Sequence, residues 1–133
     1  MEINSELKEY IEKIILPKYN NNDLYDGKWE NGMRNGYGVY KWADGKQYAG
    51  NYVNDNREGI GVFTGWVYTD SDGISWKGTY SGEHKDNHFE GSGKFTFDNG
   101  DSFDGVFKAD RFWTGTYTRK DGSYYTIENG EPR

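Results

Sequence analysis

The sequence contains no cysteine and only two prolines among its 133 residues. Without cysteine the chain has neither disulfide bonds nor thiolate chemistry. Leucine, isoleucine, valine and phenylalanine together supply 22 residues, a share that by itself is typical of disordered chains. The 24 aromatic residues (12 Tyr, 7 Phe and 5 Trp) reverse that expectation, because each ring can bury roughly 150–250 Å². We therefore expect one small domain with an aromatic core.

Long apolar runs and clusters of positive charge are also missing. No apolar run approaches the ~20 residues of a membrane span, and the first residues lack the apolar segment of a signal peptide. The chain has 16 Lys and Arg against 22 Asp and Glu, and its longest basic run is Arg119-Lys120. Nucleic acids and anionic membranes both attract basic clusters. This balance disfavours both partners, and we expect a cytoplasmic protein.

The sequence has no catalytic motif of the GxSxG, GxxxxGK[ST] or HExxH form. Its two histidines, His84 and His88, stand four residues apart with acidic neighbours. They fall in a stretch that joins two expected strands, where this spacing fixes no metal geometry. We predict a solvated loop there, no metal site, no cofactor, no small-molecule substrate and no enzymatic activity.

A short unit at residues 24–45 organises the rest of the chain. Its halves are Tyr25-Asp26-Gly27-Lys28-Trp29 and Gly36-Tyr37-Gly38-Val39-Tyr40, followed by Asn31-Gly32 and Asp44-Gly45 respectively. Side chains alternate between the faces of a strand, so each half places large aromatics and bare glycines on one face. Asn-Gly and Asp-Gly pairs predict hairpins, because type I′ turns need positive φ.

The unit recurs along the chain. Aromatic-Gly-aromatic triplets begin at residues 25, 48, 76 and 103, with spacings of 23, 28 and 27. We attribute the longer spacings to insertions of five residues around 65–68 and four residues around 83–88. The fourth copy is degenerate, with Trp113 in place of the first glycine of its second half. The aromatic positions expected to pack within the molecule are Tyr25, Trp29, Tyr40, Tyr48, Tyr52, Phe63, Trp76, Tyr80, Phe95, Phe103, Phe107 and Tyr117.

This pattern resembles the MORN repeat (membrane occupation and recognition nexus), roughly YEGEW-x-NG-x-x-x-GxGxY-x-x-x-DG. Residues 24–45 match it nearly position for position, with Asp26 where the family usually has Glu. The resemblance covers about 24–130, as four repeats and a partial fifth. It implies an all-β fold, an elongated and twisted single antiparallel sheet of consecutive hairpins, with about nine strands.

The same resemblance implies a non-enzymatic scaffold that binds a peptide or a partner subunit on its sheet. The family name implies an alternative, a peripheral module that binds membrane phospholipid, which the acidic charge disfavours. A third hypothesis is an accessory or antitoxin-like neighbour of a larger protein.

Residues 1–23 lie outside the repeat and precede the repeat domain of 24–133. Apolar residues at helical spacing, from Ile3 to Ile15, predict a helix over 5–16 that Pro17 ends. An isolated helix of this length is marginal in water. We expect it to cap the first hairpin, and the alternative is a helix that binds a partner or a second copy.

The face opposite the aromatics has an apolar band, namely Tyr37, Val39, Ala49, Val53, Ile60 and Val62. Trp66 and Tyr68 lie in an insertion, as either a lid on the sheet or an exposed anchor. We also expect the aromatic face to remain partly open. Monomers rarely leave a large apolar patch unused, so we predict contact with a protein partner or a second copy through Tyr37, Val39, Val53, Ile60, Val62, Trp66 and Tyr68.

Overall fold

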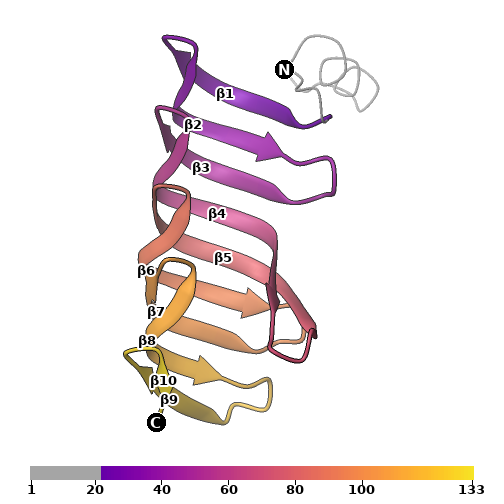
Figure 1. Ribbon diagram of the computed structural model, residues 1–133, viewed down its shortest axis with the longest axis vertical. Coiled ribbons are helices and arrows are strands. Elements are labelled where there is room, and N and C mark those ends of the chain that lie inside the picture. The colour runs from indigo at the N-terminus through magenta and orange to yellow at the C-terminus, as the bar shows by residue number, and fades with distance from the viewer. Residues whose placement is uncertain (1–21) are drawn as a thin grey trace.

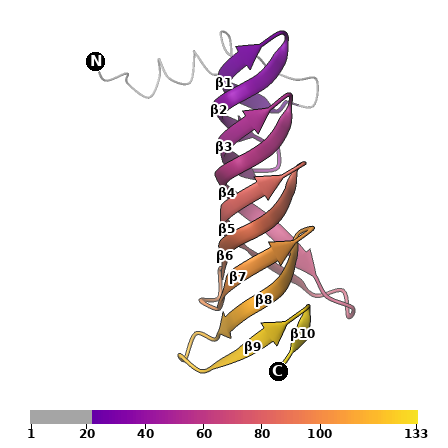
Figure 2. The same ribbon diagram turned by 90° about the vertical axis from the view of Figure 1, so that its left-hand side faces the viewer.

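The computed structural model describes residues 22–133, which form one ten-stranded antiparallel sheet in sequence order. The strands stack side by side into a long, twisted column (Figures 1 and 2). They are β1 Leu24–Glu30, β2 Met33–Lys41, β3 Gln47–Val53, β4 Asn56–Thr69, β5 Ser75–Lys85, β6 His88–Phe97, β7 Ser102–Lys108, β8 Arg111–Thr118, β9 Tyr124–Glu128 and β10 Glu131–Pro132. This confirms the all-β single sheet. The helix predicted over 5–16 falls outside the described residues. Within the described residues, no helix is long and apolar enough to span a membrane.

Two kinds of connection alternate along the column. Two-residue turns such as Asn31-Gly32 and Asn54-Asp55 have positive φ at both positions, as type I′ turns require. The Asp-Gly and Asn-Gly pairs in the loops at the opposite ends of the strands, such as Asp44-Gly45, have positive φ only at glycine. There the Gly45 N–H donates to the Trp42 carbonyl within a longer loop. The type I′ prediction was therefore right for Asn31-Gly32 and wrong for Asp44-Gly45.

A row of paired glycines crosses the sheet. The register aligns one glycine from each of eight successive strands, from Gly27 on β1 to Gly115 on β8; the row is Gly27, Gly38, Gly50, Gly61, Gly82, Gly93, Gly105 and Gly115. The row lies on the aromatic face, because glycines and rings alternate with the outward side chains. It marks the line along which the rings pack closest to the backbone.

Each ring that starts a repeat lies over a glycine pair of this row. The Tyr25 ring covers Gly27 and Gly38, and its hydroxyl donates to the Lys28 carbonyl at 3.0 Å. A Cβ atom on Gly38 would lie 2.2 Å from the Tyr25 hydroxyl oxygen. No side chain other than hydrogen fits beneath the ring. The same arrangement recurs with Tyr48 and Tyr80, whose hydroxyls donate to the carbonyls of Asn51 and Glu83. The Phe103 ring lies against Gly115 in the same way but has no hydroxyl.

The glycine row corrects the repeat frame. It aligns Tyr80-Gly82-His84 with Tyr25-Gly27-Trp29, so the repeats begin at residues 25, 48, 80 and 103, with spacings of 23, 32 and 23. The two predicted insertions are therefore one insertion of nine residues. Trp76-Gly78-Tyr80 imitates the aromatic-Gly-aromatic pattern, but Trp76 pairs with Tyr68 outside the repeat.

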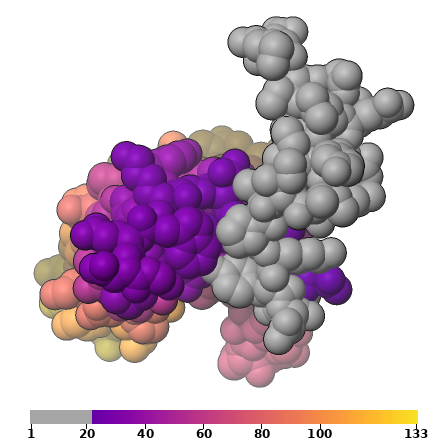
Figure 3. All heavy atoms as spheres, turned by 90° about the horizontal axis from the view of Figure 1, so that it is seen from above, coloured from indigo at the N-terminus to yellow at the C-terminus, as the bar shows by residue number. Residues whose placement is uncertain are grey.

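The insertion extends β4 and β5 into a hairpin, residues 65–78, that we call the arm. The arm begins at a bulge between Thr64 and Trp66. It leaves the column and runs toward the C-terminal repeats (Figures 1 and 2), and its tip stands apart from the column in the view along the long axis (Figure 3). The Tyr68 ring lies 5.0 Å from Phe95 and 5.2 Å from Phe112, measured between ring centroids. Its hydroxyl donates to the Asp110 carbonyl. The arm is therefore a lid on the aromatic face, one of the two alternatives expected for this insertion.

Most of the aromatic face is closed, and it remains partly open, as expected, at Trp29 and Trp76, which are each 42% exposed. Twist of the sheet and coverage by the arm let the rings pack edge to face along the column, an arrangement that aromatic quadrupoles favour. Together they bury a continuous core of Tyr25, Tyr40, Tyr48, Tyr52, Phe63, Tyr80, Phe89, Phe95, Phe97, Phe103, Phe107 and Ile127.

We predict that Gly93→Ala will destabilise the protein by about 3 kcal/mol, the upper range for overpacking a core. The added methyl would meet the Tyr80 ring at 2.5 Å, so the ring must leave its place. Urea denaturation followed by fluorescence measures the change. Gly73→Asn is the control, since Gly73 has open space around it and its positive φ suits asparagine. Equal midpoints for the two variants would contradict the close packing of ring and glycine.

Candidate interaction surfaces

The face opposite the rings carries apolar side chains on β2, β3 and β4. Val39 pairs with Ala49, and Ala49 pairs with Val62, so these three lie side by side on adjoining strands. Tyr37 and Ile60 lie nearer the two-residue turns and leave 60% and 66% of their surface exposed. We call these five residues the outer band. It brings together four of the seven predicted contact residues.

The outer band ends at β4. The register continues its central row from Val62 through Ser81, Lys94, Asp104 and Thr116, all of them polar. Val106 on β7 is exposed and apolar, but Ser92 and Thr114 are its cross-strand partners. The repeat does not require apolar residues on this face, so their presence in the first half needs a separate reason.

The other three predicted contact residues are placed differently. Val53 is exposed but lies at the rim of the sheet, at the end of β3 beside the turn. Trp66 and Tyr68 lie on the aromatic face, because a bulge between Thr64 and Trp66 reverses the alternation of side chains. Gly65 makes this bulge with a φ of +86°. Trp66 and Tyr68 therefore cannot belong to the same surface as the outer band.

One position in each repeat covers the first ring. In the first two repeats it is arginine: the Arg34 guanidinium lies 5.9 Å from the centroid of the Tyr25 ring, and that of Arg57 lies 5.8 Å from the centroid of the Tyr48 ring. In the next two it is phenylalanine, and Phe89 stacks on Tyr80 at 3.9 Å. Arginine and phenylalanine can occupy the same position because a cation and a second ring both pack favourably on the face of an aromatic ring. Sequence reasoning missed this position, which follows the two-residue turns by two residues.

The hairpins are also linked through their turns. Asp55 accepts the Arg34 backbone N–H at 2.8 Å and donates its own N–H to the Arg34 carbonyl. Asn87 and Asp110 make the same paired contacts with Arg57 and Phe89. These polar turn residues recur at the spacings of the repeat, which is the signal by which the corrected frame was detectable from sequence.

The two ends of the aromatic face differ. Tyr52 contacts the Tyr48 ring of its own repeat at 5.2 Å and the Tyr25 ring of the preceding repeat at 5.5 Å. Its equivalent in the first repeat, Trp29, contacts only Tyr25 among the described rings and stays 42% exposed, against 2% for Tyr52. At the other end Ile127 occupies the glycine row opposite Gly115 and is buried. The described sheet is thus open at Trp29 and closed at Ile127.

The histidines are not in a solvated loop as predicted. His84 is 3% exposed and lies between the Tyr48 and Tyr80 rings, at the position equivalent to Tyr52. Burial lowers the pKa of His84 to about 4. His88 is exposed, with Nδ1 at 2.8 Å from an Asp110 carboxylate oxygen. Within residues 22–133 no three His, Asp or Glu side chains are grouped closely enough to hold a metal ion.

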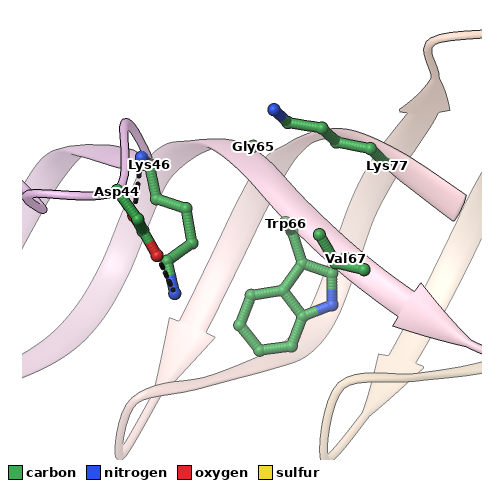
Figure 4. Close-up of a pocket in the computed structure, with 6 residues that line it drawn as sticks. All are labelled: Asp44, Lys46, Gly65, Trp66, Val67 and Lys77. Atoms are coloured by element: carbon green, nitrogen blue, oxygen red, sulfur yellow. Dashed lines mark hydrogen bonds and ion pairs between the residues drawn. The ribbon is translucent and has the colours of Figure 1, made fainter. Parts of the chain in front are cut away.

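A cavity of about 320 Å³ lies where the arm leaves the column (Figure 4). Trp66, Val67 and Lys77 line it from the two strands of the arm. Lys46 is paired with Asp44 at 3.3 Å on the facing loop. The lining mixes both charges with one large ring, so it does not select one class of ligand.

Consecutive β-hairpins joined into one sheet, each with a ring over a pair of glycines, define a β-hairpin repeat protein. The family model of the MORN repeat matches residues 25–47, 48–65 and 80–102. Its third match begins at Tyr80, in agreement with the structure and not with the frame predicted at Trp76. The chain is a MORN-repeat protein.

Curated relatives with the same repeat include alsin from Homo sapiens and from Rattus norvegicus. Each is 32% identical to this chain over 84 residues. The match covers 63% of this chain but only 5% of alsin.

We predict that stability will fall as the pH is lowered from about 6.5 to 4, by roughly 2–3 kcal/mol in total. In this window the unfolded chain protonates His84 while the folded protein keeps it neutral, so the unfolded state binds more protons. The lowered carboxyl pKa values of Asp44, Asp55, Asp70 and Asp121 act mainly below this range, because stability from such groups is lost from about pH 5 downward.

Urea titrations at several pH values measure this effect. His84→Phe should flatten the decline, because phenylalanine already fills the equivalent position 107. His88→Gln, an exposed control, should retain it. A decline that is unchanged in His84→Phe would show that another group is responsible.

Proposed function

We propose that this chain is a non-catalytic protein-binding module that binds an apolar segment of a partner, or a second copy, on the outer band. The observation that carries the proposal is the exposure of Tyr37 and Ile60 beside Val39, Ala49 and Val62 on three adjoining strands. Contiguous apolar surface of this kind marks interaction sites on folded proteins. MORN repeats occur in modules that interact with proteins or membranes, which supports a binding role.

The placement of charge favours protein over lipid. The whole chain carries a net charge of −6, whereas anionic headgroups are attracted by exposed Lys and Arg clusters. Two of its arginines, Arg34 and Arg57, lie over rings on the aromatic face. An apolar contact on the outer band requires no basic cluster. Its affinity should depend only weakly on salt, because screening acts on charges.

We predict that Ile60→Thr, alone and with Tyr37→Thr, will abolish binding of the partner while the melting temperature changes little. Both positions are exposed, and threonine keeps a strong preference for strands. The partner is first isolated from the native source with the wild-type chain. Its dissociation constant is then measured for each variant at low and high salt, and light scattering reports self-association.

The matched control is Val106→Thr, an exposed valine on the same face but outside the outer band. It should bind like the wild type. Retention of every partner and of the native mass by the Tyr37/Ile60 double variant would rule out this surface. Sedimentation with phosphatidylserine vesicles that weakens as salt is raised would favour the lipid alternative instead.

A further inference from the structure

A second cavity, of about 340 Å³, lies between the arm and the last hairpin. It lies on the aromatic face, away from the outer band. The arm supplies one wall, the β9–β10 hairpin supplies the other, and residues of β6 and β8 lie between them. The lining apolar residues are Tyr68, Trp76, Phe97, Phe112, Ile127 and Pro132.

The arm creates this cavity and holds its wall in place. Tyr68 is fixed by ring contacts with Phe95 and Phe112 and by its hydrogen bond to the Asp110 carbonyl. Trp76 is the cross-strand partner of Tyr68, and its indole N–H donates to an Asp70 carboxylate oxygen at 3.2 Å. Trp76 nevertheless remains 42% exposed. An oriented but uncovered indole is suited to contact with a ligand.

Among the residues that the structure describes, Arg111 is the one charged residue that lines the cavity. Between residues 22 and 133, no hydrogen bond or ion pair engages its guanidinium. The nearby charges are engaged elsewhere: the Asp110 carboxylate binds His88 and the Phe89 N–H, and Arg133 pairs with Glu128 at 3.6 Å. Glu131 lies between two lining residues in sequence but does not itself line the cavity. The charge offered to a ligand is therefore positive.

We propose that this cavity binds a peptide through one bulky apolar side chain and an adjacent carboxylate that pairs with Arg111. The volume is near the lower end for ligand pockets, of order 300 Å³, which suits one large side chain. The planar guanidinium holds a carboxylate by two parallel hydrogen bonds. The carboxylate is either a peptide C-terminus or an Asp or Glu side chain beside the apolar residue. This site is separate from the outer band, so either can fail without the other.

Three probe peptides test the proposal against the full chain. The first is acetyl-Gly-Gly-Phe with a free C-terminal carboxylate, and the second is the same peptide as its amide. The third, acetyl-Gly-Phe-Glu-Gly-amide, carries only a side-chain carboxylate. Two-dimensional NMR of the ¹⁵N-labelled protein gives each dissociation constant. The resonances of the Trp76 indole N–H, Arg111 and Ile127 report where binding occurs.

We expect at least one of the two carboxylate peptides to bind at least fivefold more tightly than the amide, with shifts at these three residues. Arg111→Gln should reduce that affinity to the level of the amide and leave the melting temperature unchanged. Trp76→Ala should weaken all three peptides, because it removes one wall. Lys94→Gln, an exposed cation on the outer face, is the matched control and should bind like the wild type.

Three results would overturn the proposal. They are equal affinities for the carboxylate and amide peptides, an Arg111→Gln variant that keeps the preference for carboxylate, and shifts confined to residues outside the cavity. Absence of binding by every probe at millimolar concentration would equally reject the site. Peptide binding that survives Ile60→Thr, with the partner of the outer band lost, would show that the two sites act separately.

Discussion

The contact between a ring and a pair of bare glycines is the interaction on which the rest of this fold depends. Within residues 22–133 no second layer covers the sheet, so the ring that begins each repeat must lie against its own backbone. That is possible only where two neighbouring strands both lack a Cβ atom, as at Gly27 and Gly38. The hydroxyl then reaches a carbonyl three residues further on. Steric exclusion thus fixes the strand register, which is kept even across the nine-residue insertion between Gly61 and Gly82.

Because of this constraint, the two faces of the sheet have different roles. The aromatic face uses its rings, and the cations above them, for packing within the molecule. Arg34 and Arg57 are examples, since their charges lie over rings and not in a basic patch. The outer face carries no ring over the glycine row, so its positions are not restricted to aromatic residues. It is free to vary, and it differs between the apolar first half and the polar second half of the sheet. Binding specificity in such a column is therefore expected on the outer face or where the regular repeat is interrupted.

Most of the fold could be predicted from the sequence, because the glycine and ring spacing is a local signal. The frame of the third repeat could not be predicted by the same rule. Trp76-Gly78-Tyr80 satisfies the aromatic-glycine pattern, but the pairing of Gly61 with Gly82 shows that Trp76 and Gly78 belong to the arm. That error placed His84 in a loop when it lies in the core.

The candidate surface was partly accessible to the same reasoning. Alternation along regular strands placed Tyr37, Val39, Ile60 and Val62 correctly on one face. It failed for Trp66 and Tyr68, because a single-residue bulge at Gly65 reverses every side chain beyond it. The cavity at Arg111 depends on contacts between residues 42 positions apart, such as Tyr68 and Asp110. Periodicity within one strand carries no information about them.

The arm changes the way in which this column is expected to unfold. A stack of hairpins in which each repeat contacts only its neighbouring repeats behaves as a one-dimensional array, and its ends can fray independently. Tyr68 breaks that rule, since it lies on β4 in the second repeat and packs against Phe112 on β8 in the fourth. Separation of β8 from the stack must also strip contacts from the arm. The middle and the C-terminal half of the sheet are therefore coupled into one cooperative unit. Strands β1 and β2 lie outside that unit.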